Sequence, residues 1–145
     1  MKRNLAVFVA AVAALVVLGA ANPAGAADEA TRYGCTVLPH TPYITVINGV
    51  RYAEANVYVR CDTGYTVIVN GKIMEADPGS DDQVVFKTAS ATVPGDRLAR
   101  KVLTMRGRCS NFDPTGAEEL FTTAMINVGG VNSAWAQTYE ISTTC

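Results

Sequence analysis

The segment from Cys35 to Cys61 reads CTVLPHTPYITVINGVRYAEANVYVRC and decides the fold. Near its middle lies Asn48-Gly49, a dipeptide typical of the tight turn in a β-hairpin. We take Ile47 and this dipeptide as a three-residue loop, closed by glycine in the left-handed conformation. Pairing outward from this loop places Cys35 opposite Cys61, so the sequence predicts one long hairpin with a cysteine at each base.

This register gives the hairpin one apolar face and one mostly polar face. The pairs on the apolar face are Cys35 with Cys61, Val37 with Val59, and Thr41 with Ala55. The pairs on the polar face are Leu38 with Tyr58, His40 with Asn56, Pro42 with Glu54, and Ile44 with Tyr52. We expect the apolar face to point into the core. Because Pro39 and Pro42 have no amide hydrogen, their strand should lie at an edge or contain a β-bulge.

The four cysteines all lie beyond residue 26, and an even number of cysteines in an exported chain predicts two disulfides. The hairpin register favours Cys35–Cys61, which leaves Cys109–Cys145. Closing the first of these loops should contribute about 3 kcal/mol to stability. A second pattern stays open, because the segments ending at Cys61 and Cys109 share an alternating rhythm. Joining them across a sandwich, as immunoglobulin domains do, would give Cys61–Cys109 and Cys35–Cys145.

Residues 1–26 have the features of a secretory signal peptide. Lys2 and Arg3 precede an apolar stretch from Leu5 to about Ala21, and a small-x-small cleavage site follows at residues 24–26. The stretch is close to the length of a membrane anchor, but glycine, asparagine and proline residues interrupt its end. We therefore predict a signal-peptide helix cleaved near residue 26, no stable membrane anchor after cleavage, and a secreted, extracellular protein.

Residues 27–145 then form the mature chain, whose 119 residues suit a single domain. It contains ten of the twelve Lys and Arg residues and all thirteen Asp and Glu residues. This mild acidity gives no basic footprint for nucleic acid. We therefore expect one β-sandwich domain without a nucleic-acid partner.

The remainder of the mature chain shows short strand patterns separated by turn signals. Residues 65–69 are rich in β-forming residues, and Asn70-Gly71 after them predicts a second hairpin turn. Further strands are expected at residues 72–75, 83–87, 98–109 and 118–127. In the strand at 98–109, Leu103, Met105 and Gly107 should share the inward face.

The last segment alternates most regularly. One of its faces carries Trp135, Gln137, Tyr139, Ile141, Thr143 and Cys145. We expect this face to point inward, because it holds the largest side chain and the final cysteine. About seven or eight short strands with no convincing helix predict an all-β fold, an immunoglobulin-like antiparallel β-sandwich.

Four features extend over the mature chain: the Cys35-Thr36-Val37 opening followed by Pro42, the Val59-Arg60-Cys61 strand end, Cys109 before a turn, and the terminal Cys145. With these features the chain resembles the small, mostly uncharacterised secreted β-sandwich proteins of actinobacteria. The resemblance implies an immunoglobulin-like sandwich with two disulfides and brings no active site with it.

No constellation of catalytic residues stands out. His40 is the only histidine, the hairpin register places it on the polar face, and no Gly-x-Ser-x-Gly motif is present. Glu118 and Glu119 are adjacent, so on a strand they point to opposite faces. We expect no catalytic residue, no cofactor and no enzymatic activity.

Four carboxylates gather around one predicted turn, at Glu75, Asp77, Asp81 and Asp82. Calcium is bound by oxygen ligands that such loops supply, which makes these residues calcium candidates. Their spacing matches no defined calcium loop, and solvated acidic turns are common. The sequence therefore predicts no metal site, and the calcium interpretation remains as the alternative.

Tyr52 and Tyr58 are the candidate binding residues, because the predicted register places both on the outer face of the hairpin. They favour a non-catalytic binding or structural module whose partner is an extracellular protein or a cell-wall carbohydrate. The alternative function is an inhibitor of secreted proteases or other hydrolases. Its candidate loops are 94–97 and 109–111, of which the first contains Arg97.

Overall fold

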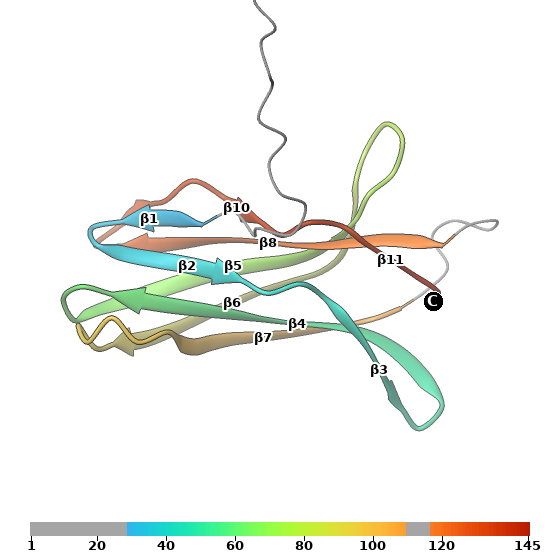
Figure 1. The fold of residues 1–145 in the computed structure, drawn as a ribbon, viewed down its shortest axis with the longest axis horizontal. Helices are drawn as coiled ribbons and strands as arrows, with labels where there is room; N and C mark the ends of the chain where they lie inside the picture. Colours follow the sequence, from blue (N-terminus) through green and yellow to red (C-terminus); the bar gives the residue numbers. More distant parts are fainter. Residues whose placement is uncertain (1–28, 110–116) are drawn as a thin grey trace, which may run out of the picture.

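The computed structural model describes residues 29–109 and 117–145, which form two antiparallel β-sheets stacked as a sandwich (Figure 1). The predicted signal peptide lies outside the described residues, as do residues 110–111 of one predicted inhibitor loop. Within the described ranges, no helix is long and apolar enough to cross a membrane.

The first sheet is built around one long central strand, β4. The strands of this sheet are β1 (Ala30–Arg32), β2 (Cys35–Pro39), β3 (Tyr43–Ile47), β4 (Val50–Cys61) and β7 (Arg100–Arg108). β4 pairs with β2 and β3 along one edge and with β7 along the other, while β1 pairs with β2. A β-bulge interrupts the β4–β7 pairing, so Val57 opposes Leu103 and Tyr58 opposes Lys101.

The second sheet is built around β5 and β8. Its strands are β5 (Tyr65–Glu75), β6 (Asp82–Val93), β8 (Glu118–Val128), β9 (Val131–Asn132), β10 (Ala136–Gln137) and β11 (Ile141–Thr143). β5 lies between β6 and β8, and the three short strands all pair with the other edge of β8. Seven of the described strands have five or more residues, in line with the predicted seven or eight. Of the four shorter strands, β1 and β9 were not predicted, whereas β10 and β11 both lie within the last predicted strand.

The base of the first hairpin has the predicted register. Cys35 opposes Cys61, Val37 opposes Val59 and Leu38 opposes Tyr58. The disulfides are Cys35–Cys61 and Cys109–Cys145, so the favoured pattern is confirmed and the second pattern is wrong.

The tip of this hairpin differs from the prediction by one residue. Asn48 and Gly49 both have positive φ, at 51° and 77°, and form a two-residue turn in which Ile47 opposes Val50. The offset is absorbed at residues 40–42, between β2 and β3, where Pro42 has no amide hydrogen.

The offset changes which residues of β3 point outward. Ile44 opposes Ala53 and packs against the core, so its predicted place on the outer face beside Tyr52 is wrong. Tyr43, instead of Pro42, opposes Glu54 on the outer face.

The predicted turn at Asn70-Gly71 is wrong, because both residues lie inside the continuous strand β5. Gly71 is buried and points at the first sheet. A Cβ atom on it would lie 2.8 Å from both Leu103 Cδ2 and Met105 Sδ. The glycine therefore allows close approach of the two sheets instead of a tight turn.

The predicted inward face of the last segment is wrong over residues 135–139, although Ile141 on the same predicted face packs against the core. Trp135 is 43% exposed and Tyr139 is 49% exposed, whereas Ala136 and Thr138 are buried. Ala136 opposes Ala124 of β8, which is itself fully buried. The paired alanines therefore occupy the buried face at this place, and the indole lies on the outside.

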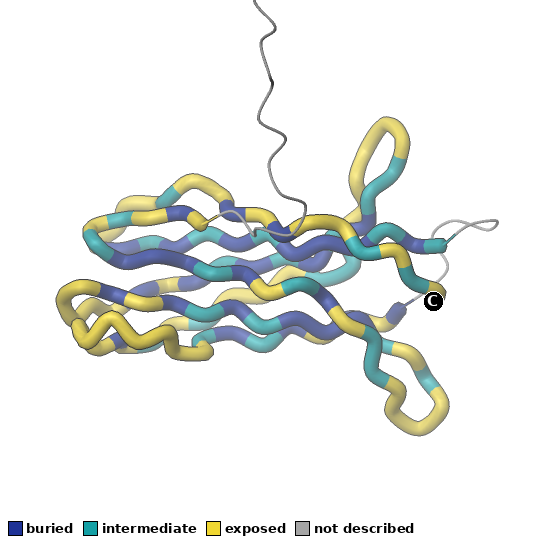
Figure 2. The backbone as a smooth tube through the Cα atoms, in the orientation of Figure 1, coloured by how far each residue is buried: buried dark blue, intermediate teal, exposed yellow. Residues whose placement is uncertain are grey.

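Buried residues alternate with more exposed ones along the strands of both sheets (Figure 2). The core is composed mainly of small and medium aliphatic side chains from both sheets. Leu103, Met105 and Gly107 of β7 point inward as predicted. The main core residues are Val37, Ala53, Ala55, Val57, Val59, Val67, Val69, Ile73, Leu103, Met105, Leu120, Ala124, Ile126 and Val128.

Removing either disulfide should lower the free energy of unfolding by about 3–4 kcal/mol, because each one closes a loop in the unfolded chain. The loops span sequence separations of 26 and 36 residues. The test is urea unfolding of the double variants Cys35→Ala with Cys61→Ala, and Cys109→Ala with Cys145→Ala. A loss below 1 kcal/mol for either pair would contradict the expectation.

Gly71→Ala should lower the free energy of unfolding by about 1–2 kcal/mol, because the added methyl group overlaps Leu103 and Met105. Combining it with Met105→Ala should cost less than the two single variants summed, since the methyl group would occupy part of the vacated space. Urea unfolding of the three variants measures this coupling. Strict additivity would show that Gly71 does not face Met105.

Candidate functional site

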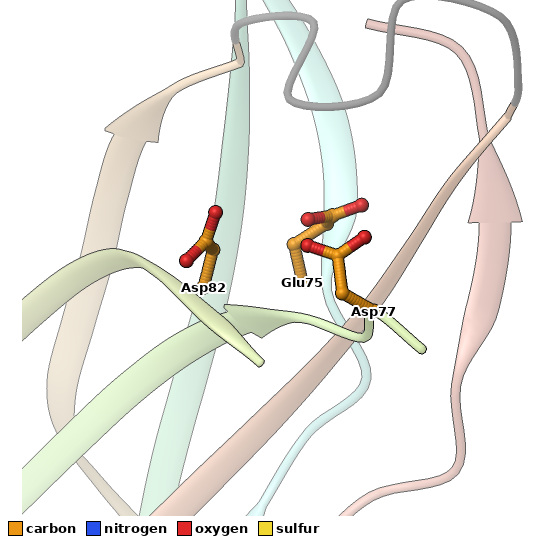
Figure 3. Close-up of side chains that lie close together, drawn as sticks. All are labelled: Glu75, Asp77 and Asp82. Carbon is orange, nitrogen blue, oxygen red and sulfur yellow. The ribbon is translucent and has the colours of Figure 1, made fainter. Parts of the chain in front are cut away.

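An acidic cluster lies at the turn between β5 and β6. Glu75 is the last residue of β5, Asp82 is the first residue of β6, and Asp77 lies between them. One carboxylate oxygen from each lies within 4.8 Å of the others. Figure 3 shows the carboxylates of Glu75 and Asp77 beside each other, with that of Asp82 across the turn from them. Asp81, the fourth calcium candidate, is exposed and is not a member of this group.

Glu75 is the unusual member of the acidic cluster, because it is only 1% exposed. Burial raises the pKa of Glu75 to about 7, and the neighbouring carboxyl groups of Glu118 and Asp77 add to this effect. Its Oε2 atom has no hydrogen-bond partner among the described residues.

The neighbour Glu118 begins strand β8 and is also 1% exposed. The half-buried Glu119 follows it on the other face of the strand. Because both Glu75 and Glu118 are buried, neither can contact a large substrate. Buried carboxylates must instead be neutralised by a proton, a cation or a positively charged side chain. In the described part of the chain, no Lys or Arg forms a salt bridge with Glu75, Asp77 or Asp82.

A second candidate site is the outer face of the first sheet, which we call the basic face. It is defined by the residues of β4 that alternate with the buried ones and by the side chains opposite them on β2, β3 and β7. Its main residues are Tyr43, Tyr52, Glu54, Asn56, Tyr58, Arg60, Lys101, Thr104, Arg106 and Arg108.

The centre of the basic face is a network around Glu54. The Tyr43 hydroxyl donates a hydrogen bond of 2.6 Å to Glu54 Oε1, and Arg106 Nε donates one of 2.7 Å to Glu54 Oε2. The Tyr43 hydrogen bond, together with Arg106, holds the pKa of Glu54 below its usual value. The same contact raises the pKa of Tyr43. The network therefore keeps one carboxylate ionised and fixes the orientation of a tyrosine and an arginine.

Two further contacts order this face beside the network. The Thr104 hydroxyl donates to Asn56 Oδ1 over 2.7 Å, and the rings of His40 and Tyr58 stack with centroids 4.4 Å apart. The predicted binding residues Tyr52 and Tyr58 are half-buried here. His40, the single histidine of the sequence, thus packs its ring on a tyrosine of this face.

The basic face is positively charged although the whole chain is slightly acidic. Four cations, Arg60, Lys101, Arg106 and Arg108, share the face with one carboxylate, Glu54. At its edge, Arg60 also pairs with Glu29 over 3.0 Å. An anion approaching this face would therefore meet an excess of positive charge.

Sequence reasoning missed three features of the candidate sites. It missed Tyr43 because of the one-residue offset, and it did not connect Arg106 with Glu54 because nothing predicted the pairing of β4 with β7. It also placed Trp135 in the core, whereas its ring lies 5.0 Å from Lys72 Nζ on the outside of the second sheet. Lys72 opposes Phe86, which is 49% exposed.

The predicted inhibitor loop at residues 94–97 is held tightly against the domain. Arg97 has φ of 63°, its backbone N–H donates to the Cys61 carbonyl oxygen over 3.1 Å, and its side chain pairs with Asp62 over 2.9 Å. A Cβ atom on Gly95 would lie 2.6 Å from Thr63 Cα, so the loop packs directly on the preceding turn.

No family model and no curated protein match the chain. Among solved structures, it is similar to the solution structure of CsgH from R. palustris, with a TM-score of 0.44 and 9% sequence identity. The likeness covers 71% of this chain and 91% of CsgH. At this TM-score and identity it carries no conclusion about the chain's function. The resemblance to secreted actinobacterial proteins stays a prediction.

Glu54→Gln should lower the free energy of unfolding by about 1–2 kcal/mol at pH 7, because the variant loses a charge-assisted pair with Arg106. The pKa of Glu54 is lowered in the folded protein. Its stabilising effect is therefore present above the ordinary glutamate pKa and lost as the pH falls through the lowered value. Urea unfolding of the variant and the wild type should accordingly converge towards pH 3. A difference that is the same at pH 3 and pH 7 would contradict this origin.

Proposed function

We propose that the chain is a secreted, non-catalytic binding module that uses the basic face to hold an anionic polysaccharide. The observation that carries the proposal is the ordered network of Tyr43, Glu54 and Arg106 at the centre of a face with excess positive charge. Its side chains are fixed before a ligand arrives, which lowers the entropic cost of binding.

The chemistry of the basic face fits a charged sugar polymer. Tyrosine rings offer apolar surface with a polar edge, and arginine forks pair with carboxylates or phosphates. Tyr43 is 43% exposed, and the side chain of Arg106 is 49% exposed, so both can contact a ligand. A sheet face is also long enough to bind several units of an extended chain.

Two disulfides support a location outside the reducing cytosol. Together with the predicted signal peptide, they support secretion. A secreted polysaccharide-binding protein would meet its ligand at the cell wall or in the surrounding medium.

The alternative function, an inhibitor of secreted proteases, has less support from the geometry. Protease substrates bind as extended strands, whereas Arg97 is in the left-handed region and pairs with Asp62. Remodelling this loop would break the Arg97–Asp62 pair and the hydrogen bond from the backbone of Arg97 to Cys61.

The test is retention of the disulfide-bonded protein on immobilised polygalacturonate, with neutral dextran as the control resin. The protein should bind polygalacturonate at low ionic strength and elute as salt is raised, because the contact is electrostatic. Arg108→Glu should weaken binding by about tenfold. No retention at low salt, or equal retention on dextran, would overturn the proposal.

A matched variant distinguishes binding through the basic face from a general effect of the protein's net charge. Lys72→Glu makes the same charge change on the outer face of the second sheet. It should bind polygalacturonate nearly as well as the wild type. If Lys72→Glu and Arg108→Glu weakened binding equally, the contact would be a general charge effect and not the basic face.

A further inference from the structure

The acidic cluster at the β5–β6 turn has a geometry that fits a calcium ion. Calcium–oxygen distances are about 2.3–2.6 Å, so two oxygens bound to one ion lie no more than about 5 Å apart. The carboxylate oxygens of Glu75, Asp77 and Asp82 meet this limit, since all lie within 4.8 Å of one another. They come from the end of β5, the turn, and the start of β6, so one ion would join both sides of the turn.

A second observation points to a ligand here. Glu75 is 1% exposed, yet its Oε2 atom has no hydrogen-bond partner among the described residues. The close-up shows its carboxylate turned towards that of Asp77 (Figure 3). Burying a carboxylate oxygen without a hydrogen-bond partner is costly, and a second buried carboxyl group, Glu118, lies beside Glu75. A bound cation would satisfy the open oxygen and offset the repulsion.

We propose that Glu75, Asp77 and Asp82 form a calcium site that clamps the β5–β6 turn to the body of the second sheet. Calcium accepts irregular arrangements of oxygen ligands and fills its remaining positions with water, whereas magnesium requires near-ideal octahedral geometry at shorter distances. Two of the three ligands lie beside a solvent-exposed turn, which leaves room for these waters. The site is independent of the basic face.

The test is calcium titration by isothermal calorimetry of the full, disulfide-bonded protein after treatment with a chelator, with magnesium as the comparison. We expect one site per chain with a dissociation constant of about 0.1–1 mM, the range of extracellular calcium modules. Calcium at 10 mM should raise the melting temperature by about 3–10 °C over the chelated protein. Magnesium at the same concentration should raise it by less than half as much.

The turn itself provides matched variants. Asp82→Asn removes one ligand and should weaken calcium binding by about tenfold or more. Asp81→Asn makes the same change at the adjacent exposed residue, which lies outside the group, and should leave calcium binding within about twofold. Glu75→Gln keeps the side-chain volume and should abolish the calcium-dependent rise in melting temperature. Its melting temperature in chelator, at or above that of the wild type, would show that this variant still folds.

Three results would overturn the calcium site. The first is the absence of binding heat and of a melting shift up to 10 mM calcium in the folded wild type. The second is an equal loss of affinity in Asp81→Asn and Asp82→Asn, and the third is an equal response to magnesium. None of them bears on the binding of polygalacturonate, which is measured without calcium.

Discussion

The alternation of side chains along β4 is the constraint on which both the core and the basic face depend. Ala53, Ala55, Val57 and Val59 are fully buried between the sheets, so the residues between them must point outward. A slip of one residue would bury charged side chains and expose the valines, which makes the register strongly determined. The same register aligns Cys35 with its disulfide partner. The register of β4 therefore determines both the packing of the core and the composition of the basic face.

Sequence alone predicted the base of the hairpin because two independent signals agreed there: the apolar alternation and the positions of the two cysteines. At the tip only the Asn48-Gly49 dipeptide was available, and it is compatible with loops of two or three residues. The chain uses a two-residue loop and absorbs the difference around Pro42, between the segments β2 and β3 that pair with β4. The one-residue difference in loop length places Tyr43 opposite Glu54. Local sequence patterns do not contain this information.

The other errors concern distances between sheets, which no local pattern contains. Asn70-Gly71 has the composition of a turn, but Gly71 lies inside β5, where its missing side chain leaves room for Leu103 and Met105 of the first sheet. Trp135 has the size of a core residue, but the buried positions beside it are the paired Ala124 and Ala136. The acidic cluster was visible as composition around one turn. The burial of Glu75 and its proximity to Glu118 of β8 could not be predicted, because both depend on how β5 and β8 pair in the folded protein.

The burial of Glu75 beside Glu118 is hard to explain by stability alone. Apolar residues of similar volume would fill the same space without the cost of desolvating carboxyl groups. Their presence has a physical reason if a cation supplies the missing charge, because the cluster then ties β5 to β6 only where the cation is available. The disulfides likewise form only in an oxidising compartment. If the chain is secreted as proposed, both the disulfides and a bound cation would add to its stability outside the cytosol.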